Sequence, residues 1–174
     1  MEKDERQLEL DRKEFYSYDS SWEHTFFDEI TGGFLVTQLD RKYKDMTKNE
    51  KDIFRKEQEM GMKYASFGFQ IEHLNETPGI SSPDVAIHRH GLPIRVNGVM
   101  ADLKRLSSSN NIYQEGKDAR YKKGADLILF EFTWHFSGVL RSLKILGLKG
   151  IRITSKSMCL GVDILKSKEE VVYI

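Results

Sequence analysis

The stretch SSPDVAIHRHGLPIRVNGVMADLKRLSSSNN, residues 81–111, decides the fold because it contains two strand patterns joined by a turn. The run 83–88 starts with proline, which a strand tolerates at its first position. Asn97-Gly98 is typical of a hairpin turn, and the run 99–106 leaves it as a second strand. The stretch therefore predicts two strands of one sheet, with a polar Ser/Asn loop after them.

Three ionisable residues of these strands, Asp84, Asp102 and Lys104, are candidates for chemistry. Side chains alternate along a strand, so Asp102 and Lys104 share a face, which we expect to be the more open side of the sheet. Asp84 begins the other strand. Two carboxylates and an ammonium can hold a divalent cation and balance negative charge on phosphorus. The alternative is structural, with Asp84 capping a turn and the other two residues forming a solvated pair.

The segment before this stretch predicts a helix and a strand. Thr47 and Glu50 have the spacing of a capping box, and apolar residues follow at helical intervals up to Gly68, which ends the helix. Glu50 is thus a candidate for a structural role at the start of the helix. FQIEHL, residues 69–74, alternates as a short strand does, and NETPGI is a turn.

The segment after it predicts further alternation of helices and strands. We expect a helix over about 111–123, a buried strand over 125–132, a helix over 137–146 and a strand over 150–154. The order α-β-β-β-α-β followed by α-β makes a mixed sheet with flanking helices, in the α/β or α+β class.

The N-terminal part has a different composition. Residues 1–16 are densely charged and predict a solvated helical arm, and residues 16–46 are irregular and aromatic with a Gly-Gly break. We expect this second part to wrap one side of the core. The predicted organisation is an N-terminal arm over 1–46 and one domain over 47–174.

Length and composition fit a soluble protein that buries one sizeable core. The chain has 174 residues, of which 39% are hydrophobic and 31% charged, and its formal net charge is zero. Acidic side chains dominate residues 1–60 and basic ones the rest, which permits a polyanionic partner without requiring one. A single cysteine excludes an internal disulfide. No apolar run could span a membrane and the charged N-terminus is unlike a signal peptide, so we expect a cytoplasmic protein with no membrane contact.

The combination of a helix acid, Pro-Asp on one strand, Asp-x-Lys on the next and a basic helix resembles the PD-(D/E)xK nuclease core. The matching stretches, from NEKDIFRKEQEMGMKYASFG to KKGADLILFEF, cover residues 48–132. Within that group the chain is most similar to the tRNase-type domains at the C-terminal ends of bacterial contact-dependent inhibition and other polymorphic toxins, and it is similar to domains of phage head-morphogenesis proteins. HRHGLPIRV lengthens a hairpin that is usually short, and the middle acid is Asp where Glu is commoner.

The resemblance implies an endonuclease, a hydrolase of phosphodiester bonds, that uses Mg²⁺. It implies Asp84 and Asp102 as metal ligands, Lys104 as the residue that stabilises charge, and Glu50, or Glu57/Glu59, as the helix acid. It also makes Ser108, Asn110 and Asn111 candidates for substrate contacts. A toxin domain would act in a target cell's cytoplasm and would have a cognate immunity protein as its partner.

The basic helix supports a nucleic-acid substrate by itself. Lys117, Arg120 and Lys123 recur at a spacing of three, and Arg105 lies nearby in the sequence. Such side chains bind phosphates without reading sequence, so RNA, tRNA in particular, and DNA are both candidate substrates.

Two alternatives remain open. One is a metal-independent ribonuclease of the barnase, EndoU, colicin or RelE-like kind, in which histidine and lysine act as base and acid. His88 and His90 share a strand face and are the candidates for that chemistry. The other is a module that keeps a nuclease-like fold but only binds nucleic acid or protein.

Overall fold

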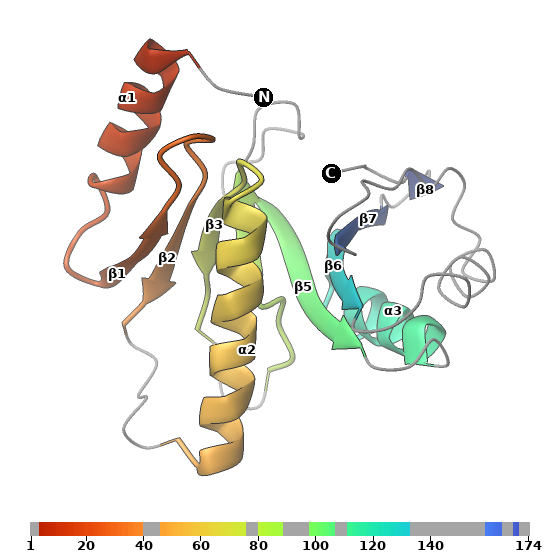
Figure 1. Cartoon of the computed structure of the whole chain (residues 1–174). Helices are drawn as coiled ribbons and strands as arrows, with labels where there is room; N and C mark the ends of the chain where they lie inside the picture. The colour runs from red at the N-terminus through yellow and green to blue at the C-terminus, as the bar shows by residue number, and fades with distance from the viewer. Residues whose placement is uncertain are drawn as a thin grey trace. The chain divides into compact units, whose positions relative to one another are not determined.

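A computed structural model gives the fold, and its chain divides into two compact units (Figure 1). Unit 1 comprises residues 1–76 and 84–99, and unit 2 comprises residues 77–83 and 100–174. The structure describes residues 4–39, 46–75, 80–88, 98–106, 111–132, 159–164 and 169–170. The predicted boundary between residues 46 and 47 falls inside unit 1.

Unit 1 is a mixed sheet with two helices. Its elements are α1 (Glu5–Phe15), β1 (Trp22–Phe27), β2 (Phe34–Gln38), α2 (Lys48–Ala65), β3 (Gln70–His73) and β4 (Val85–His88). Strand β1 is antiparallel to β2, β2 is parallel to β3, and β3 is antiparallel to β4. The predicted strands over 69–74 and 83–88 are therefore confirmed.

Unit 2 has a second mixed arrangement of strands and one described helix. Its elements are β5 (Val99–Leu106), which begins at the unit boundary, α3 (Ile112–Tyr121), β6 (Leu127–Phe132), β7 (Cys159–Ile164) and β8 (Glu169–Glu170). Strands β5 and β6 are parallel, and β6, β7 and β8 are antiparallel in turn. Mixed sheets with flanking helices put the chain in the α+β class, as predicted.

Helix α2 forms for the reason that its sequence suggests. The Thr47 hydroxyl accepts from the Glu50 amide, and the Glu50 carboxylate accepts from the Thr47 amide at 2.7 Å, so the capping box is complete. The helix ends at Ala65, and Gly68 turns the chain away with a φ of 91°. The buried side chains of α2 face β2 and β3, where Gly61 lies against Leu35.

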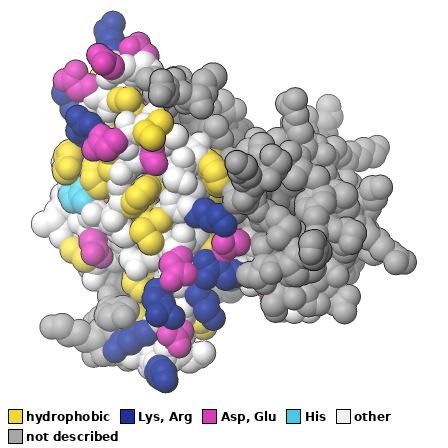
Figure 2. Space-filling model, viewed as in Figure 1, with side chains coloured by type: hydrophobic (Ala, Val, Ile, Leu, Met, Phe, Trp, Pro, Cys, Tyr) yellow, Lys and Arg dark blue, Asp and Glu magenta, His cyan; other side chains and the backbone are white. Residues whose placement is uncertain are grey.

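The outer face of α2 is charged but mixed in sign. Figure 2 shows basic and acidic side chains side by side over this helix. Arg55 lies 3.5 Å from Asp52 and 3.9 Å from Glu59, both within one helical turn. Such exposed pairs contribute little stability, and they keep the face from being a uniformly basic surface.

The N-terminal segment is more ordered than predicted. We expected residues 16–46 to be irregular, but β1 and β2 form a hairpin whose second strand lies beside β3. Leu35 and Val36 are completely buried, so β2 is a core strand rather than a cover. At its entry a side chain on Gly33 would place its Cβ 1.9 Å from the Ala65 carbonyl oxygen, which only glycine avoids.

The elements predicted after β6 cannot be compared with the structure, because they fall on residues that the structure does not describe. The helix predicted over 137–146 and the strand predicted over 150–154 lie outside the described residues, as does Asn97 of the predicted turn. Strands β7 and β8 were not predicted. No helix within the described ranges is both long enough and apolar enough to cross a bilayer.

Candidate functional site

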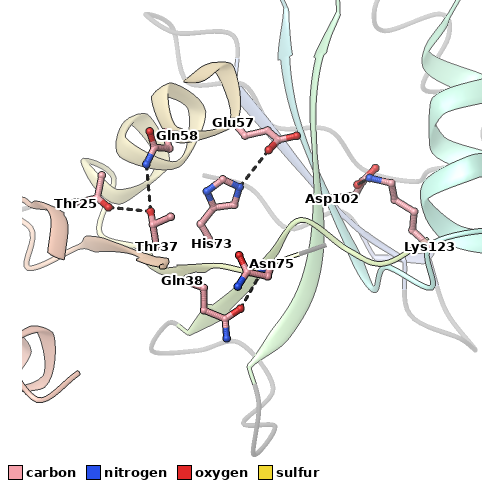
Figure 3. Close-up of polar contacts among 9 residues, drawn as sticks. All are labelled: Thr25, Thr37, Gln38, Glu57, Gln58, His73, Asn75, Asp102 and Lys123. Atoms are coloured by element: carbon pink, nitrogen blue, oxygen red, sulfur yellow. Dashed lines mark hydrogen bonds and ion pairs between the residues drawn. The ribbon is translucent and has the colours of Figure 1, made fainter. Parts of the chain in front are cut away.

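The carboxylate of Asp102 in unit 2 is completely buried and lies between two lysines (Figure 3 shows Asp102 and Lys123). The Lys123 ammonium donates to Oδ1 at 2.6 Å, and the Lys104 ammonium lies 2.9 Å from Oδ2. Lys104 is also 3.5 Å from the Glu115 carboxylate. We call Asp102, Lys104, Lys123 and Glu115 the Asp102 cluster.

Three elements of unit 2 bring these four residues together. Asp102 and Lys104 share a face of β5, as the alternation predicts, and their neighbours on β6 are Ile128 and Phe130. Glu115 comes from α3, which therefore lies over this face. Lys123 follows the helix, and its backbone amide still donates to the Asp118 carbonyl at 3.2 Å.

The expectation that this face is open was wrong for Asp102, because α3 and the segment after it cover the carboxylate. Burial of a carboxylate costs several kcal/mol, as an order of magnitude, unless opposite charge and hydrogen bonds offset it. Here an ammonium group is placed at each carboxylate oxygen. The pairing of Asp102 with Lys104 was predicted, but the burial and the part played by Lys123 were not.

Two acids near this site were missed by the sequence reasoning. Glu115 lies in the predicted basic helix, and its contact with Lys104 needs the helix to pack on β5. Asp126 is buried just before β6, and its amide donates to the Met100 carbonyl at 2.8 Å. Because Leu127 is paired with Ala101, alternation assigns Asp126 to the same face as Asp102. Its position at the start of an apolar strand, after a basic helix, was the available signal.

The predicted substrate residues divide into several groups. Arg105 points to the opposite face of β5 and forms an ion pair with Glu131, its neighbour on β6. Lys117 and Asn111 are exposed, as a binding surface requires. Lys123 lies beyond the end of α3, so it does not continue a helical stripe. Ser108, Asn110 and the side chain of Arg120 lie outside what the structure describes.

The three candidate acids of α2 have different surroundings in unit 1. Glu50 is exposed and serves the capping box, which favours its structural role. Glu59 is exposed near Arg55. Glu57 alone of the three faces the sheet, and its carboxylate lies 3.2 Å from Nε2 of buried His73.

His73 is one of several polar residues between α2 and the sheet, and Figure 3 draws their separate contacts. Its ring is stacked on Phe54 with 5.1 Å between centroids. On the neighbouring strand the Thr37 hydroxyl contacts Thr25 at 2.8 Å and accepts from Gln58 at 3.4 Å. These contacts lie within the packing of α2 on the sheet, which makes His73 a packing residue.

Asp84 lies in unit 1, whereas the Asp102 cluster lies in unit 2. Its side chain is buried, and its carbonyl accepts from the Leu74 amide at 2.9 Å, which continues the β3–β4 pairing. The predicted association of Asp84 with Asp102 therefore stays a prediction.

His88 forms a second polar cluster in unit 1. Its Nε2 lies 3.4 Å from Glu72, and the Tyr18 hydroxyl donates to the same Glu72 oxygen at 2.7 Å. The bond to Glu72 raises the pKa of His88 above its ordinary value, against the effect of partial burial. Burial raises the pKa of Glu72, but the bonds from His88 and Tyr18 outweigh it and hold that pKa below the usual range. His90 lies outside the described residues.

Metal-ligating groups do not gather in threes among the residues that the structure describes. Magnesium commonly binds through one or two protein carboxylates plus waters and substrate phosphates, so a smaller set is sufficient for it. Comparison of the chain with protein-family models, with curated proteins and with solved structures found no match.

Proposed function

We propose that the protein is a nuclease that hydrolyses phosphodiester bonds and that the Asp102 cluster is part of its catalytic site. The observation that supports this is the completely buried Asp102 carboxylate with two lysines around it. Structural ion pairs are usually exposed, and buried charges are retained more often where chemistry needs them. The resemblance to Asp-x-Lys nucleases suggests phosphodiester hydrolysis as the reaction.

The proposed roles follow from the chemistry of the side chains. A carboxylate is a ligand for Mg²⁺, and the cation, when bound, polarises a phosphoryl oxygen and lowers the pKa of water. Lys104 is held beside the carboxylate and would stabilise negative charge on phosphorus. Exposed Lys117 and Asn111 would contact the substrate backbone. We propose RNA, and tRNA first, as the substrate, with DNA as the competitor in the test.

The test is cleavage of tRNA and of double-stranded DNA by the purified protein, with Mg²⁺ or with EDTA. Lys104→Met and Asp102→Asn should each lower the rate at least about a hundredfold, the usual effect of removing a charged catalytic group. Arg105→Met is the matched control, because this cation lies on the opposite face of the same strand and should change the rate little. Cleavage that survives both site substitutions would refute the assignment.

A second candidate is metal-independent cleavage of RNA by His88. The observation that favours it is the His88–Glu72 pair, because a carboxylate fixes an imidazole's orientation and raises its pKa toward the range of a general acid. Cleavage in EDTA that is lost in His88→Gln would select it. Binding of RNA or DNA without cleavage would instead favour the non-catalytic module.

The toxin proposal adds a partner and a place of action. A cognate immunity protein would cover the Asp102 cluster, and complementary charge would speed its association. Co-purification of the chain with the product of a neighbouring gene, followed by loss of cleavage, tests this. Action in the cytoplasm, whether of the producing cell or of a target cell, belongs to the same proposal.

A further inference from the structure

The two lysines of the Asp102 cluster are attached to the fold in different ways. Lys104 is two residues from Asp102 on β5, and the backbone there is fixed by pairing with β6. Lys123 comes from the connection between α3 and β6, 21 residues further along the chain. Gly124 follows it with a φ of 69°, and a side chain there would meet nothing within 4 Å. Lys123 is thus in an open connection, whereas Lys104 is in a strand.

Each lysine is placed at a different carboxylate oxygen. Lys104 is at Oδ2 and also lies near Glu115, so its charge has two acidic neighbours. Lys123 is at Oδ1, and its side chain is 21% exposed although the carboxylate is completely buried. Its long flexible stem can withdraw toward solvent without movement of the sheet.

We infer that Lys123 occupies the position of the divalent cation at Asp102 in the free protein and leaves Oδ1 when the cation binds. This inference deepens the proposed nuclease function and rests on it. The donor set fits the cation, because Asp102 supplies a carboxylate oxygen and buried Asp126, just before the adjacent strand β6, is assigned to the same face by alternation. Exchange of an ammonium for a divalent cation satisfies the carboxylate in both states.

The exchange would link cation binding to substrate binding. Replacement of one positive charge by two makes the surroundings of Asp102 more positive, and the ammonium of Lys123 becomes available to a phosphate. The lysine would thereby keep a buried carboxylate paired until the cation and the nucleic acid arrive. Lys123 is a positioning residue in this scheme, since it acts through Asp102.

The inference is tested by the affinity for Mn²⁺, measured by titration calorimetry without nucleic acid. Lys123→Gln removes the competitor and should bind Mn²⁺ about tenfold more tightly than the unaltered protein. Lys123→Arg keeps a cation and Lys122→Gln changes the exposed lysine directly before it, so both should bind as the unaltered protein does. Asp102→Asn should lose the affinity. Equal or weaker binding in Lys123→Gln would overturn the inference.

A second measurement needs no substitution and covers the case in which Lys123→Gln does not fold. Acetylation of the lysines by acetic anhydride is followed by mass spectrometry with and without Mg²⁺. Lys123 should react faster when Mg²⁺ is present, and the rate at Lys117 should not change. An unchanged or slower rate at Lys123 would count against the exchange.

The two proposals fail in different ways. Tighter Mn²⁺ binding in Lys123→Gln without cleavage of any nucleic acid would refute the nuclease and leave the exchange standing. Cleavage that depends on Asp102, together with unchanged Mn²⁺ affinity in Lys123→Gln, would refute the exchange alone.

Discussion

Each unit buries a polar group beneath a helix, and the two groups have different neighbours. In unit 1, α2 covers His73, which has the Glu57 carboxylate on one side and the Phe54 ring on the other. In unit 2, α3 covers Asp102, which has lysines at both of its oxygens. Burial of an uncharged imidazole costs less than burial of a charged carboxylate, which needs cations around it.

The comparison separates packing from chemistry. The His73–Glu57 pair and the nearby contacts of Thr37 with Thr25 and Gln58 lie between α2 and the sheet, and their loss would weaken that packing. The Asp102 cluster concentrates charge at one point, where replacement by apolar side chains would give similar or better stability. A costly arrangement that packing does not require is a reason to look for function there.

The largest expected effect is that of Asp102→Ala on stability. Removal of the carboxylate leaves the partly buried ammonium groups of Lys104 and Lys123 close together, without the negative charge between them. The substitution should therefore lower the free energy of unfolding by about 3–5 kcal/mol. Urea denaturation measures this. Asp118→Ala is the control, because it removes the exposed pair with Lys122 and should change stability too little to resolve. If Asp102→Ala lowers the free energy of unfolding as little as the control does, the buried charge in unit 2 is not costly and the contrast with His73 in unit 1 is lost.

A smaller effect is expected from His73→Leu in unit 1. The apolar side chain keeps most of the volume but leaves the Glu57 carboxylate without the imidazole, at a cost of about 1–3 kcal/mol. The double variant His73→Leu, Glu57→Leu should recover most of that loss, because both partners are then apolar. If the single variant is as stable as the unaltered protein in urea, the bond contributes nothing and His73 is only a space-filling residue.

The smallest effect concerns pH and His88. The pKa of His88 is raised, so its pair with Glu72 stabilises the fold below the ordinary pKa of 6.5 and loses that effect as pH rises through the folded value. The pKa of Glu72 is lowered, so the stabilisation by its charged carboxylate is present above pH 4.5. This stabilisation is lost as pH falls through the pKa of Glu72 in the folded protein.

The expected result is therefore a difference in Tm between the unaltered protein and His88→Gln that is largest between these two values. It should shrink as pH rises above 6.5. Thermal unfolding monitored by circular dichroism at a series of pH values measures it. A difference that stays constant from about pH 5 to about pH 8 would show that the imidazole's charge is not involved.

Local signals predicted most of the described elements. The Thr47–Glu50 box predicted the start of α2 to the residue, since both halves of the box act within one turn. Alternation predicted β3, the opening proline β4, the Asn-Gly turn β5 and the apolar run β6. Such features depend on neighbours in the sequence, and one sequence is enough to find them.

Features that depend on distant segments were missed. The FLV run at the start of β2 is short, and its burial results from parallel pairing with β3, more than 30 residues later in the chain. The Asp102 carboxylate was expected to be accessible because alternation indicates a face but not what covers it. The cover comes from α3 and Lys123, and no local pattern connects those residues to β5.

The close approach at Gly33 has a consequence for shortened versions of the chain. Strand β2 enters the sheet against the carbonyl of Ala65, so the segment before residue 47 and the end of α2 are fitted to each other. A protein cut at residue 47 would lose β2, expose the faces of β3 and α2 that it covers, and leave a sheet edge open to aggregation. The N-terminal segment is thus part of the folding unit, and the smallest fragment worth purifying begins before β1.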